Sequence, residues 1–132
     1  KEISFTKVNP ENLFLTNCDI ISPCALGKAI NTKNRNQLKC AAIVGAANNQ
    51  LDSTETAKWL FNNKIVYSPD YLVNSGGVIA IAAEINKTES LMDQHLNKIS
   101  VRLESVLLES KENNVPTDFI AKRIALERIN NS

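Results

Sequence analysis

Short apolar runs recur along the first half of the chain. Residues 18–22, 41–46 and 65–67 are apolar and rich in β-branched side chains, without alternating polar positions. Such runs are typical of parallel strands buried on both faces, whereas half-exposed antiparallel strands alternate. A weaker alternation over residues 3–8 predicts one more strand, followed by a short helical turn that opens at Pro10.

Helical patterns separate these apolar runs. Residues 26–38, with a break near Asn31, predict one helix, and residues 54–62 predict another, capped by Asp52 or Ser53. Strands that alternate with helices through short connections indicate a parallel α/β sheet with right-handed crossovers.

Beyond Pro69 the strand signals stop and helical patterns follow from Val78 onward. Residues 78–86 predict a helix rich in small side chains. Apolar residues then recur from Met92 at steps of four and three, which predicts a long amphipathic helix ending near residues 113–114. Pro116 opens a last predicted helix. The chain thus reads as a strand and helix portion followed by a helical tail.

Length and composition describe one ordinary domain. The 132 residues are 43% hydrophobic and 22% charged, which excludes disordered and fibrous classes. The formal charge of +1 argues against a nucleic-acid partner, which would require a basic excess. No apolar run approaches the ~20 residues of a membrane span and no signal peptide is visible, so we expect a cytoplasmic protein without a membrane partner. Three cysteines fit neither a disulfide framework nor a metal site, and we expect reduced thiols.

Three segments that follow the predicted strands could hold a ligand. In open parallel sheets, ligands bind beyond the carboxyl ends of the strands. Those ends lead into residues 22–27, 45–50 and 68–77, which are rich in small and amide side chains. We expect the three segments to form one rim of a small-molecule site. Asparagine pairs occur at four places in the chain, so such a pair is weak evidence by itself. Asn48 and Asn49 are candidates for ligand binding because their pair follows a predicted buried strand.

Other polar residues have simple structural alternatives. Residues 75–77 (Ser-Gly-Gly) could bind an anion at a helix start, or could only permit a tight turn and close helix packing. Cys24 could act as a nucleophile, but the sole histidine, His95, lies far along a predicted helix. Asp19 and Asp70 read more simply as cap or turn residues. The residues alone therefore indicate a small-molecule-binding α/β domain without a complete catalytic set.

The same loops carry a resemblance to a known enzyme family. The stretches are CDIISPCALG (18–27), IVGAANNQL (43–51) and YSPDYLVNSGGVI (67–79), with ERI (127–129) near the end. In order and separation they resemble the leucine, phenylalanine, valine and glutamate dehydrogenases, most closely the leucine dehydrogenase branch. The resemblance implies NAD-dependent oxidative deamination of an L-amino acid, a partial Rossmann-like parallel sheet followed by C-terminal helices, and a homo-oligomer.

The resemblance also implies roles for individual residues. Those expected to contact the cofactor NAD are Cys24, Ala25, Ala47, Asn48 and Asn74. Those expected to contact the substrate are Asn49, Val78 and Ile81. Because Ile81 is aliphatic, it favours a branched aliphatic substrate such as leucine or valine: an apolar wall gains from burying methyl groups and cannot pair a carboxylate.

Several family features have no counterpart in this sequence. These are the lysines of the N-terminal substrate domain, the GxGxxG turn and the acidic ribose-binding residue. We therefore expect residues 1–132 to be a single domain, the C-terminal part of a dinucleotide-binding domain (sheet portion 1–74, helical tail 75–132). No catalytic residue or metal ligand is expected in it, and the isolated chain should be inactive. The alternatives are a non-catalytic binding or assembly domain, and a fragment of a glutamate-type dehydrogenase.

Overall fold

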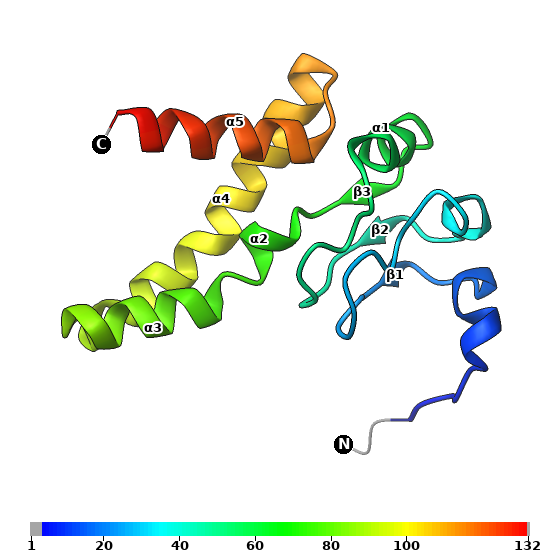
Figure 1. Cartoon of the computed structure of the whole chain (residues 1–132), viewed down its shortest axis with the longest axis horizontal. Coiled ribbons are helices and arrows are strands. Elements are labelled where there is room, and N and C mark those ends of the chain that lie inside the picture. Colours follow the sequence, from blue (N-terminus) through cyan, green and yellow to red (C-terminus); the bar gives the residue numbers. More distant parts are fainter. Residues whose placement is uncertain (1–3, 132) are drawn as a thin grey trace.

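The computed structural model describes residues 4–131 and contains a small parallel sheet flanked by helices (Figure 1). The strands are β1 (Ile20–Ile21), β2 (Ala42–Ile43) and β3 (Val66–Tyr67), arranged in the order β1-β2-β3. Both pairings are parallel. The α/β class and the parallel sheet expected from the apolar runs are confirmed.

The start of the chain differs from its expected strand over residues 3–8. Residue 3 lies outside the described part, and residues 4–8 have no regular secondary structure. Within residues 4–131 the sheet consists of β1, β2 and β3, and residues 4–8 pair with none of them. The predicted helical turn is present as the 3-10 helix η1 (Pro10–Leu15), with the Asn9 side chain accepting a hydrogen bond from the Glu11 amide at 3.1 Å.

The connection from β1 to β2 is mostly irregular, and the helix expected over residues 26–38 is wrong. Only a short 3-10 turn, η2 (Arg35–Gln37), forms there. Lys28 has the left-handed φ of 56°, and its amide donates to the Asn49 carbonyl at 2.6 Å. Hydrogen bonds to the loop after β2, together with complete burial of Ile30, replace the intrahelical bonds that local propensity favours.

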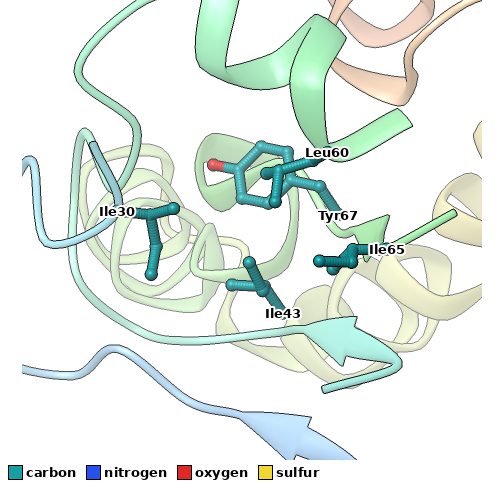
Figure 2. Close-up of a cluster of buried hydrophobic side chains, with 5 residues drawn as sticks. All are labelled: Ile30, Ile43, Leu60, Ile65 and Tyr67. Carbon is teal, nitrogen blue, oxygen red and sulfur yellow. The ribbon is translucent and has the colours of Figure 1, made fainter. Parts of the chain in front are cut away.

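Helix α1 (Thr54–Asn62) connects β2 to β3 as predicted, and Ser53 is its cap. The Ser53 hydroxyl accepts a hydrogen bond from the Thr56 amide at 3.2 Å. The main hydrophobic core lies where α1 meets the sheet (Figure 2). Its buried members come from the β1–β2 connection, β2, α1 and the start of β3: Ile30, Ile43, Leu60, Ile65 and Tyr67.

The remainder of the chain is helical, as expected. A short helix that was not expected, α2 (Asp70–Val73), follows β3 directly. The others are α3 (Gly76–Asn86), the 3-10 turn η3 (Glu89–Leu91), α4 (Met92–Asn113) and α5 (Thr117–Asn130). Helices α3 and α4 form an antiparallel hairpin that extends away from the sheet (Figure 1). Helix α5 packs against the C-terminal part of α4. None of the helices within residues 4–131 is long and apolar enough to cross a bilayer.

Candidate functional site

The loops that follow the three strands are joined by hydrogen bonds at one end of the sheet. The Ala47 amide donates to the Pro23 carbonyl at 2.9 Å, which links the loops after β1 and β2. The backbone N–H of Gln50 donates to the Asp70 carboxylate at 3.4 Å, which links the loops after β2 and β3. Residues 22–27, 45–50 and 68–77 are called the rim from here on. The sequence predicts that these loops lie together because all three follow the carboxyl ends of parallel strands. The hydrogen bonds confirm this prediction.

Asn48 and Asn74 meet across the rim. The Nδ2 atom of Asn74 donates to Oδ1 of Asn48 at 2.5 Å and to the Ala46 carbonyl at 3.4 Å. Asn48 is exposed and Asn74 is half-buried. Within residues 4–131 the Asn48 Nδ2 and the Asn74 Oδ1 have no hydrogen-bond partner, so one donor and one acceptor remain for a ligand.

Gln50 braces the loop after β2 from inside. Its side chain is completely buried, and Nε2 donates to the Gly45 carbonyl at 2.7 Å and to the Ala47 carbonyl at 2.9 Å. No donor within residues 4–131 reaches its Oε1. The sequence carries no signal for this role of Gln50, because a run of amide side chains does not reveal which one is buried. The buried amide holds the backbone that presents Ala47 and Asn48.

Glycine is required where the loops after β1 and β2 approach each other. A Cβ at Gly45 would lie 2.6 Å from both N and Cδ of Pro23 and would also overlap its carbonyl oxygen. A Cβ at Gly27 would lie 2.9 Å from the Asn48 carbonyl oxygen. The obstructing atoms are mostly backbone, so they cannot move aside cheaply. The two glycines therefore set how closely the rim closes.

Cys24 and Ala25 lie exposed in the loop after β1. The Cys24 Sγ lies 3.3 Å from the Ser22 hydroxyl, and this hydrogen bond, followed by one with the Ala46 backbone, lowers the pKa of the Cys24 thiol. The thiol is more readily ionised than a free cysteine but is solvent-exposed. His95, the sole histidine of the sequence, lies on α4 and not in the loop after β1.

Ala47 and Asn49 occupy opposite environments in the loop after β2. Ala47 is 5% exposed, so its contribution to a ligand site is its small size and its backbone. Asn49 is exposed and adopts the left-handed φ of 53°, which asparagine tolerates better than most residues. Its carbonyl accepts a hydrogen bond from the Lys28 amide, which fixes the backbone of Asn49 at the rim.

Val78 and Ile81 lie on α3, beyond the rim. Their side chains are 71% and 59% exposed, and Ile85, one turn further, is 75% exposed. The spacing places the three on one helix face, an apolar surface rather than a closed pocket. The structure therefore brings Cys24 and the asparagines into the rim but does not enclose the two expected pocket residues.

A buried tyrosine and aspartate anchor the loop after β3. The Tyr67 hydroxyl donates to Oδ1 of Asp70 at 3.1 Å, and Thr117 donates to the Tyr67 carbonyl at 2.6 Å. Burial, followed by the Asp70 charge, raises the pKa of Tyr67 well above its usual value. In residues 4–131 no cluster of three or more histidine, cysteine or acidic side chains could hold a metal ion. The rim is thus an amide-rich surface.

Comparison with known proteins assigns this architecture to a family. The sequence model of the Glutamate/Leucine/Phenylalanine/Valine dehydrogenase family matches residues 1–131. The chain belongs to this family. It is 41% identical over 125 residues to leucine dehydrogenase of Bacillus subtilis, an alignment that covers 92% of this chain and 34% of that protein.

Solved structures agree with this family membership. The crystal structure of L-tryptophan dehydrogenase from Nostoc punctiforme superimposes with a TM-score of 0.87 at 36% identity, covering 94% of this chain and 38% of that one. A hetero-hexameric glutamate dehydrogenase from Thermus thermophilus gives a TM-score of 0.74 at 20% identity, over 96% of this chain and 32% of that one, and this likeness concerns the fold alone. The chain spans about a third of the length of the curated relatives that it matches.

Proposed function

We propose that this chain provides one wall of the cofactor groove in an NAD-dependent dehydrogenase that deaminates a branched-chain L-amino acid to its 2-oxo acid and ammonia. Family membership supports the reaction class. The observation that carries the proposal is the Asn48–Asn74 pair at the carboxyl end of the sheet. Ligands of open parallel sheets bind at this end.

The groups of the rim are suited to the nicotinamide half of NAD. The free Asn74 Oδ1 and Asn48 Nδ2 supply one acceptor and one donor, which is the complement of a carboxamide. Exposed Ala25 and Cys24 add small side chains beside them, so a flat ring and its ribose can approach the backbone closely. Cys24, Ala25, Ala47, Asn48 and Asn74 would hold and orient NAD, which would supply the acceptor for a hydride from the amino acid.

The substrate side of the proposal rests on Asn49, Val78 and Ile81. The exposed Asn49 amide can hold the polar end of an amino acid. Val78 and Ile81 offer methyl groups on α3 and would form part of a wall around an aliphatic side chain. An apolar wall stabilises leucine or valine by burying their methyl groups and disfavours glutamate, whose carboxylate it cannot pair.

The chain alone should not turn over substrate. Residues 1–132 contain no GxGxxG turn, the element that binds the pyrophosphate in dinucleotide-binding folds, and they match about a third of the length of leucine dehydrogenase of Bacillus subtilis. The complete enzyme should be a homo-oligomer. Exposed apolar side chains on α3 and α5, among them Ile129 at 70% exposed, offer surface for association.

A chimera tests the proposal directly. Residues 1–131 would replace the matching third of Bacillus subtilis leucine dehydrogenase, and formation of reduced NAD would be followed with leucine, valine, phenylalanine and glutamate. We expect turnover that prefers leucine or valine, and roughly fivefold weaker NAD binding when Asn74 becomes alanine, since one charge-free hydrogen bond to a ligand is worth about 1 kcal/mol. Asn86→Ala, on an exposed asparagine at the end of α3, is the matched control. A folded chimera that binds NAD but deaminates no amino acid would contradict the proposal.

A further inference from the structure

Cys18 and Cys40 lie in two neighbouring segments that lead into β1 and β2. The strands pair Ile20 with Ala42 and Ile21 with Ile43, and the two cysteines precede these paired residues. The Cys18 amide donates to the Lys39 carbonyl at 3.1 Å and the Ala41 amide donates to the Asp19 carbonyl at 3.0 Å, so the two segments run side by side. Backbone segments joined by such hydrogen bonds lie about 5 Å apart, inside the usual range of Cα separations for disulfides.

Both sulfur atoms are free and sheltered. Cys18 and Cys40 are half-buried thiols, and Cys40 packs against the hydrophobic core. Burial raises the pKa of Cys40, and the Cys18 thiol raises it further, so each sulfur lies within electrostatic reach of the other. Cys24, the third cysteine, is exposed at the opposite end of β1. Its position makes it an internal control for any thiol reaction.

We propose that Cys18 and Cys40 are a redox-sensitive dithiol, which a peroxide converts into an intramolecular disulfide linking β1 to β2. One thiolate attacks a peroxide oxygen, the O–O bond breaks, and the departing hydroxide takes up a proton to become water, leaving a sulfenic acid. The second thiol attacks the sulfenic sulfur, the S–S bond forms, and the sulfenic oxygen leaves as a second water. Two thiols lose two electrons and one hydrogen peroxide is reduced.

This pairing is separate from the rim and from the proposed dehydrogenase function. It lies at the amino ends of β1 and β2, whereas the rim lies at the carboxyl ends. The disulfide closes a loop that includes β1 and the connection to β2, whose regular structure is the short 3-10 turn η2. We expect the oxidised chain to unfold at a higher urea concentration than the reduced chain, because the cross-link restricts the unfolded state.

Peptide mapping of the full 132-residue chain tests the proposal. Trypsin leaves Cys18 and Cys24 together in residues 8–28 and Cys40 in residues 40–58, so the Cys24→Ser variant makes the assignment unambiguous. After treatment with hydrogen peroxide, we expect these two peptides to be joined, with two hydrogen atoms fewer than their sum. The link should disappear on reduction with dithiothreitol.

Two further variants make the outcome decisive. Cys18→Ser combined with Cys24→Ser leaves only Cys40, and no intramolecular link should form. In the unmodified sequence, Cys24 reports that peroxide has reached the protein. The proposal is overturned if Cys24 is oxidised while Cys18 and Cys40 stay as thiols, if they oxidise separately to sulfinic acids, or if they link two chains instead of closing one.

Discussion

The strand region buries its large apolar side chains, whereas helix α3 of the hairpin leaves most of its own exposed. Around the sheet, Ile30, Ile43 and Leu60 are 0% exposed. On α3 only Ala83 is buried, while Ile81 and its neighbours on the same face point to solvent. The strand region therefore draws its stability from contacts within this chain. The apolar face of α3 contributes little to the stability of the fold, because most of its side chains are exposed.

Truncation of a core side chain should have the largest effect and should separate the two regions. We expect Ile43→Ala to lower the free energy of unfolding by about 2–5 kcal/mol, because it leaves a cavity among fully buried neighbours. Ile81→Ala should change it by less than about 0.5 kcal/mol, because that side chain is mostly exposed. Urea unfolding measures both. Equal losses for the two variants would show that α3 is packed as firmly as the sheet.

Overpacking of the rim should have the next largest effect. Gly45→Ala places a methyl group against backbone atoms of Pro23, and we expect a loss of about 1–3 kcal/mol in unfolding free energy. Gly77→Ala is the matched control: a Cβ there meets nothing within 4 Å, and alanine favours the helix. Thermal unfolding of both variants checks this. An unchanged melting temperature for Gly45→Ala would mean that the loops after β1 and β2 can separate freely.

The parts of the fold that sequence could predict are those with a local signal. The strands follow from apolar runs, and α4 follows from its steps of four and three. The prediction of a helix over residues 26–38 is wrong because the backbone amides of Lys28 and Ile30 donate to the loop after β2. These contacts join residues that are distant in the sequence, so a local sequence pattern cannot show them. Helix α2 was missed because four residues after Pro69 carry no periodicity.

The candidate site also contains one part that the sequence could predict and another that it could not. The rim could be predicted because the strand-end rule needs only the strand positions. The brace by Gln50 could not, since burial of one amide among several depends on the folded loop. Likewise, Ile81 and Val78 form no pocket within residues 4–131, so their role as substrate contacts remains a prediction.

Removal of the buried amide brace should cost an intermediate amount. Gln50→Leu keeps the volume but leaves the Gly45 and Ala47 carbonyls without their donor, and we expect a loss of about 1–3 kcal/mol in unfolding free energy. Asn63→Leu provides the comparison, because the Asn63 amide bonds to the Trp59 carbonyl at an exposed position. Urea unfolding distinguishes the two. Equal stability of both variants would show that Gln50 is not a brace.

Alkaline pH should weaken the sheet region through Tyr67. Its pKa is raised in the folded chain by burial and then by Asp70, so the unfolded chain ionises first and gains stability relative to the folded one. The contribution of Tyr67 to the unfolding free energy should be level below about pH 10 and should then fall by up to about 1.4 kcal/mol per pH unit. Tyr67→Phe should reduce that slope, although Tyr71, whose pKa is also raised, retains part of it. Urea titrations between pH 8 and 11 test this, and an unchanged slope would contradict it.

The smallest effect concerns substrate choice and reverses the ranking of the two regions. In the leucine dehydrogenase chimera, Ile81→Ser should leave stability unchanged, because this exposed side chain supports no core. It should lower kcat/KM for leucine about five- to tenfold, since partial burial of methyl groups against a bound side chain is worth about 1 kcal/mol. Ile85→Ser, further along the same apolar face and still more exposed, is the matched control and should leave kcat/KM unchanged. Equal kcat/KM values for Ile81→Ser and the parent chimera would remove Ile81 from the substrate wall. Such a result would leave α3 as an association surface only.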